Sequence, residues 1–138
     1  MVRSILAVIG GYVALVIGVG TLLALLRVIF MGDLPEDPSQ PYDGPIIVLI
    51  LEIVLGGFIA VGGGWLCGLI AQRREFHHGL ALAGLMAVFG ALSVVVDAGL
   101  KPMWSVVLVP VFGVVGVLVG ARLRQNARER AELRAATR

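Results

Sequence analysis

The chain has 138 residues, of which 59% are hydrophobic and only 14% charged, and its mean hydropathy is +0.99. Soluble domains carry charge on about a quarter of their residues, so this composition excludes an ordinary soluble protein and indicates a membrane protein. The formal net charge of +2 does not predict nucleic-acid binding, because the basic residues stand at the ends of long apolar segments.

Long apolar segments account for most of the chain. A run of about 18 or more apolar residues is long enough to cross a bilayer core about 30 Å thick. The predicted spans cover residues 4–31, 45–71, 80–97 and 103–121. We expect the first to be an uncleaved span, because its apolar run is longer than that of a signal peptide.

Three short connections separate these spans: the acidic, proline-rich "GDLPEDPSQPYDG", then "QRREFHHG", then "AGLKP". The short last connection makes the third and fourth spans neighbours, whereas the first and second are neighbours only if the acidic loop folds back. The predicted fold is therefore all-α, with residues 1–122 forming one transmembrane domain, an antiparallel bundle of four helices. Residues 123–138 are predicted to form a short, basic, helical tail.

The distribution of basic residues predicts the orientation. Arginines gather at the N-terminus, between the second and third spans and in the tail: Arg3, Arg73, Arg74, Arg122, Arg124, Arg128, Arg130, Arg134 and Arg138. Lys101 and most of the acidic linker fall on the other side, with Arg27 close to that boundary. The positive-inside rule then places both termini in the cytoplasm. Arg73, Arg74, Arg122 and Arg124 are expected to contact lipid headgroups.

Glu52 is the acidic residue inside the second span, in the stretch "PIIVLILEIVLGG". Small residues follow it at intervals of four: Gly56, Ala60, Gly64 and Gly68. Residues at this spacing share one face of a helix, and small side chains let another helix approach closely in a membrane. We therefore predict a packing ridge on this face, with Glu52 directed toward protein.

Arg27 is the predicted partner of Glu52. Side chains tilt toward the N-terminus of their own helix, so on two antiparallel spans these two converge toward the outer side. Pairing offsets the cost of placing charge in hydrocarbon. The alternative is that Arg27 reaches the outer headgroups while Glu52 is protonated.

Asp97 suggests another use for Glu52. Acidic residues within a membrane are candidates for an ion or proton path, and Glu52 and Asp97 together would form one. Against this path, the sequence has no further deep acid and no long polar stripe. Asp97 and Lys101, four residues apart, are expected to mark the outer interface rather than to pair.

Little in the sequence predicts catalysis or a cofactor. His77 and His78 are adjacent, so their side chains diverge on a helix, and Cys67 has no histidine within one turn. Phosphate-binding loops, zinc motifs and nucleophile triads are absent from the sequence. We expect no enzymatic activity, no metal and no cofactor.

The layout resembles that of small four-span bacterial inner-membrane proteins, through its span count and span ends such as "GGGWLCGLIAQRRE". This resemblance implies the inner membrane as location and carries over no functional residue. We expect a structural or accessory subunit that contacts the lipid bilayer and associates with itself or with a larger membrane complex. Gly10, Ala14 and Gly18, a further small-residue face on the first span, favour this role. The alternative is a small oligomeric transporter or channel that uses Glu52.

Overall fold

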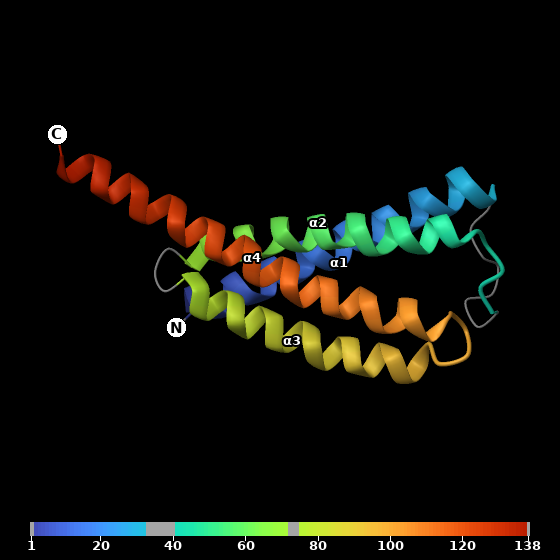
Figure 1. Ribbon diagram of the computed structural model, residues 1–138. Coiled ribbons are helices and arrows are strands. Elements are labelled where there is room, and N and C mark those ends of the chain that lie inside the picture. Colours follow the sequence, from blue (N-terminus) through green and yellow to red (C-terminus); the bar gives the residue numbers. More distant parts are fainter. Residues whose placement is uncertain (1, 33–40, 72–74, 138) are drawn as a thin grey trace.

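The computed structural model describes residues 2–32, 41–71 and 75–137. These residues form an all-helical protein (Figure 1). The helices are α1 (Val2–Met31), α2 (Ile46–Ala71), α3 (Glu75–Val96) and α4 (Met103–Ala136). Each of the four is long and apolar enough to cross a membrane.

Local signals explain where the helices end. Gly32 follows α1 with a left-handed φ of 82°, and its N–H donates to the Val28 carbonyl at 3.2 Å, as in a glycine-terminated helix. After α3, the Leu100 N–H donates to the Asp97 carbonyl at 3.0 Å, and Gly99 supplies the positive φ of 87° within that turn. Pro102 precedes α4 and cannot continue α3.

The helix α4 differs most from the sequence prediction. It continues without a break from the apolar segment through Ala136, so the structure does not show the predicted short tail as a separate element. Beyond Gly120 this segment contains neither glycine nor proline. Pairs four residues apart also support it, Arg128 with Glu132 at 2.7 Å and Gln125 with Glu129 at 2.8 Å. The end of α4 therefore projects past the other helices (Figure 1).

The helix α2 organises the packing. It makes its largest contact with α4 and also packs on α1 and α3, while α3 packs on α4. Within the described residues, α1 touches α3 only slightly and does not contact α4. The linkers formed by residues 41–45 and 97–102 lie at one end of the molecule, called the linker end below, and the N-terminus lies at the opposite end (Figure 1).

The contact between α2 and α4 brings backbone against backbone. A Cβ added to Gly64 would lie 2.8 Å from the Val117 Cα atom, and one added to Gly116 would lie 2.6 Å from the Gly57 carbonyl oxygen. A Cβ on Gly120 would similarly meet the Trp65 nitrogen at 2.8 Å. Real Cβ atoms do not approach so closely, so these positions admit only glycine unless the helices separate.

Members of the predicted ridge occupy two different environments. Ala60, Gly64 and Gly68 are buried, and Gly64 and Gly68 lie against α4. For Gly56, apart from its chain neighbours and the nearby backbone of its own helix, no atom of the described residues lies within 4 Å of the position a Cβ would take, so this glycine borders open space.

Glycines of α1 also face the protein interior. A Cβ on Gly10 would lie 3.1 Å from the Ile70 side chain, and one on Gly18 would lie 2.8 Å from the Ile59 side chain. Both isoleucines belong to α2. These glycines therefore serve packing within the chain, and they no longer support the outward association surface that the sequence suggested.

Candidate functional site

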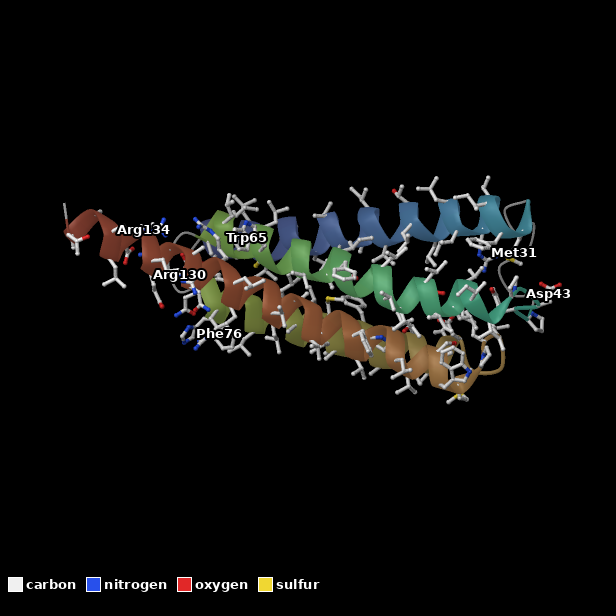
Figure 2. The ribbon with its side chains drawn as sticks, turned by 45° about the horizontal axis from the view of Figure 1, so that its top comes forward. Met31, Asp43, Trp65, Phe76, Arg130 and Arg134 are labelled. Carbon is white, nitrogen blue, oxygen red and sulfur yellow. The ribbon has the colours of Figure 1, made fainter. Side chains whose placement is uncertain are left out.

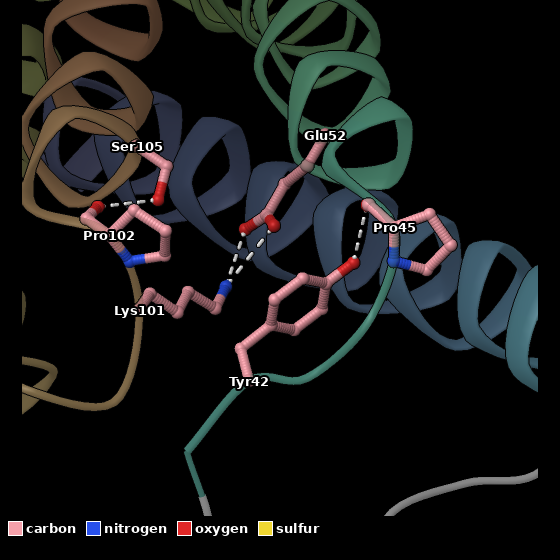
Figure 3. Close-up of polar contacts among 6 residues, drawn as sticks. All are labelled: Tyr42, Pro45, Glu52, Lys101, Pro102 and Ser105. Atoms are coloured by element: carbon pink, nitrogen blue, oxygen red, sulfur yellow. Dashed lines mark hydrogen bonds and ion pairs between the residues drawn. The ribbon is translucent and has the colours of Figure 1, made fainter.

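A largely buried ion pair of the described residues lies near the linker end and joins α2 to the α3–α4 linker (Figure 3). The Lys101 ammonium donates to both carboxylate oxygens of Glu52, at 3.0 Å to Oε1 and 3.1 Å to Oε2. Glu52 is only 7% exposed, and the Lys101 side chain is 22% exposed. A carboxylate at this depth needs such a partner, because an isolated charge away from water is costly.

One hydrogen bond between the two linkers, and one within the first, order the chain beside Lys101. The Tyr42 N–H donates to the Leu100 carbonyl at 2.6 Å, which ties one linker to the other beside the ion pair. The Tyr42 hydroxyl donates to the Pro45 carbonyl at 2.9 Å (Figure 3). Burial raises the pKa of Tyr42 above its ordinary value, which further favours the protonated phenol that donates this bond.

The structure gives Glu52 a different partner from the predicted one. Lys101 takes both carboxylate oxygens, and Arg27 makes no ion pair with the described residues. The prediction compared positions on two straight helices and treated Lys101 as an interface marker. It missed that the turn at Gly99 and the Tyr42–Leu100 bond fold the linker over the end of α2. One clue in the sequence could have identified this partner: Lys101 is the only lysine in the chain, and the charge distribution places it on the same side of the membrane as the end of α2 that carries Glu52.

Glu52 also lies in the wall of a cavity of about 290 Å³. All four helices contribute to this wall, through residues such as Val16 of α1, Gly56 of α2, Phe89 of α3 and Pro110 of α4. The lining is otherwise almost wholly apolar. One of its few other polar side chains, Ser93, donates its hydroxyl to the Gly90 carbonyl at 2.9 Å.

Asp97 is not part of this cavity within the described residues. Its N–H donates to the Ser93 carbonyl at 2.8 Å at the end of α3, and its carbonyl accepts the Leu100 N–H at 3.0 Å, which closes the following turn. The structure therefore brings Glu52 to the cavity but does not bring the two acids of the predicted ion path into one space.

A second ion pair, between α3 and α4, lies at the opposite end of the molecule. Glu75 opens α3 and is 3% exposed, and the Arg128 guanidinium of α4 donates to its Oε1 at 3.0 Å. Arg128 also binds Glu132 at 2.7 Å. Sequence reasoning missed this pair, because the two residues are 53 positions apart and no local pattern links them.

Two of the arginines predicted to contact headgroups lie near this second ion pair. The Arg122 guanidinium lies 5.5 Å from the Phe76 ring centre, and that of Arg124 lies 6.0 Å from the Trp65 ring centre, distances typical of cation–π contacts. Figure 2 shows further arginines, Arg130 and Arg134, along the projecting end of α4. Arg73 and Arg74 lie outside the described residues.

The histidines and Cys67 do not gather into a metal site. Among residues 2–32, 41–71 and 75–137, no group of three or more histidine, cysteine or acidic side chains is placed to hold a metal ion. The cysteine is buried in α2, against Gly11 of α1.

Comparisons with protein-family models, with curated proteins and with solved structures give no match for this chain. Its class therefore follows from its fold: an all-helical protein whose four helices are each long and apolar enough to span a membrane.

Proposed function

We propose that this chain is a multi-pass protein of the bacterial inner membrane, crossing it four times with both termini in the cytoplasm. In this orientation the linker end faces the periplasm, and the projecting arginine-rich end of α4 lies at the cytoplasmic surface. The lengths of the four helices and the distribution of arginines support this placement.

Within that membrane we propose a structural or accessory role exercised through helix contacts, without enzymatic activity. The observation that carries this proposal is that the buried acidic side chains form ion pairs within the chain. Glu52 and Glu75, the two buried acids in the described part of the chain, each bind a basic side chain from the second half of the chain. The first pair fastens α2 to the α3–α4 linker and the second fastens α3 to α4, and in both the charge of the buried acid is matched by its partner.

The proposed partners are the bilayer and either a second copy or a larger membrane complex. The helix α1 supports this, because it is the most peripheral helix and leaves one apolar face uncovered. On that face Ile9, Val13 and Ile17 are 52%, 47% and 63% exposed. β-Branched side chains of this kind lose little rotamer freedom when another helix packs on them.

A transporter or channel using Glu52 is the second candidate. The observation in its favour is that Glu52 lines a cavity of about 290 Å³. The apolar walls and the bound Lys101 argue against ion passage, because an ion in that space would find few groups to replace its hydration.

The oligomeric state in native membranes tests the proposal. We expect the tagged chain, extracted in a mild detergent, to be recovered in a particle whose protein mass clearly exceeds the 14.5 kDa of one chain. Light scattering corrected for bound detergent measures this mass. Recovery as a single chain would contradict an accessory role. Ion flux into reconstituted vesicles that Glu52→Gln abolishes would establish the second candidate instead.

A further inference from the structure

The cavity beside Glu52 presents an almost uncharged, apolar wall. The Glu52 carboxylate is neutralised by two hydrogen bonds from Lys101, and the Ser93 hydroxyl bonds to its own helix. Unpaired polar groups would be needed to hold water in such a space, and apolar cavities stay dry. An apolar occupant therefore suits this wall better than an ion or a polar solute.

This cavity is open on one side. Val16 of α1 and Phe89 of α3 both belong to its wall, yet they are 53% and 46% exposed. The rings of Tyr12 and Phe89, 5.5 Å apart, connect α1 to α3 and form part of this wall. The rim therefore consists of apolar side chains of α1 and α3, continuous with the exposed apolar surface of those helices.

The surroundings of Gly56 independently indicate empty space at the cavity. It lies in the cavity wall, and no atom of the described residues comes within 4 Å of the position its Cβ would take. By contrast, Gly64, Gly116 and Gly120 in the α2–α4 contact have backbone atoms of the facing helix close to that position. A larger side chain at Gly56 can therefore enter the cavity without displacing a helix.

We propose that this cavity binds the alkyl chain of a membrane amphiphile, which enters between α1 and α3. The inference rests on the membrane placement proposed above, since the opening then faces the lipid tails. With about 30 Å³ for a small group such as water or a methylene, the cavity has room for roughly ten methylene-sized groups. A chain already in lipid gains no hydrophobic free energy by entering, so the gain comes from contacts with the otherwise empty wall.

Photolabelling of the full chain in phosphatidylcholine vesicles tests this proposal. The probe is a phosphatidylcholine with a diazirine in the middle of one acyl chain, and labelled residues are located by mass spectrometry. Met86 lines the cavity, whereas Val88 on the same helix is 67% exposed outside it. We expect the labelling ratio of Met86 to Val88 to fall about twofold with Gly56→Leu and about fivefold with Gly56→Phe, as the side chain occupies the space.

Gly62→Phe is the matched control. Gly62 lies on the same helix, is exposed and also has no atom within 4 Å of its Cβ position among the described residues, but it does not line the cavity. We expect it to leave the ratio unchanged. If Gly56→Phe disrupts the fold, as judged by helical circular dichroism, Gly56→Leu alone decides the question.

The outcomes separate this inference from the membrane placement. A Met86 ratio that neither Gly56 variant lowers with either probe, in protein that floats with the vesicles, would overturn the alkyl-chain site alone. Protein that does not float with vesicles would overturn the membrane placement and this site with it. A parallel arm with a diazirine fatty acid identifies the source: labelling of Met86 by the free acid alone assigns the chain to a fatty acid, and labelling by both assigns it to bilayer lipid as well.

Discussion

Replacing Lys101 by methionine is expected to lower the free energy of unfolding by about 2–4 kcal/mol, one of the two largest effects we predict. Removing one partner of a buried ion pair typically costs about 3–5 kcal/mol, and the 22% exposure of the Lys101 side chain reduces that figure. The loss arises because the Glu52 carboxylate, only 7% exposed, remains without a partner. Denaturant unfolding in detergent micelles, followed by circular dichroism, measures this change.

Two further variants make this test specific. Combining Lys101→Met with Glu52→Gln removes the unpaired charge, so the double variant should recover most of the loss. Arg27→Met is the matched control, and we expect it to change stability by less than about 0.5 kcal/mol, because Arg27 makes no ion pair with the described residues. A larger loss of stability with Arg27→Met than with Lys101→Met would contradict the Glu52–Lys101 pair and support Arg27, the partner predicted from the sequence.

Gly64→Ala should destabilise the protein by about 2–3 kcal/mol, although alanine is the better helix former. The added methyl group would lie 2.8 Å from the Val117 Cα atom, so α2 and α4 must separate to admit it. Loss of this contact weakens the largest interface in the molecule. The same unfolding experiment measures the effect.

The control for this substitution lies two residues away. At Gly62 a Cβ meets no atom of the described residues within 4 Å, so Gly62→Ala should be neutral or stabilising by up to about 1 kcal/mol. Equal effects of the two substitutions would contradict backbone contact between α2 and α4.

The helices themselves were largely predictable from the sequence. Runs of apolar residues predicted four long helices, and the described residues form four, with α2 ending at Ala71 as expected. The boundaries that differ most, the start of α3 at Glu75 and the end of α4 at Ala136, lie in polar sequence. Span prediction follows apolarity, whereas a helix continues until a glycine, a proline or the loss of side-chain support ends it.

The candidate site was predictable only in part. Glu52 stood out as an acid within an apolar helix, and the small residues after it marked a packed face. The identity of its partner depended on how two linkers fold against each other, through the single bond from Tyr42 to Leu100. The Glu75–Arg128 pair likewise depends on tertiary packing between α3 and α4. The cavity was invisible to sequence reasoning, because the same type of residue, glycine, borders empty space at position 56 and touches backbone at position 64.

The central claim is that the chain crosses the membrane four times, with both ends on the cytoplasmic side. Paired reporter fusions test it most directly: green fluorescent protein and alkaline phosphatase, each placed after Arg138, and phosphatase inserted in the acidic linker at residues 33–40. We predict a fluorescent and phosphatase-inactive C-terminus together with an active phosphatase in the linker. An active phosphatase after Arg138 would contradict the account.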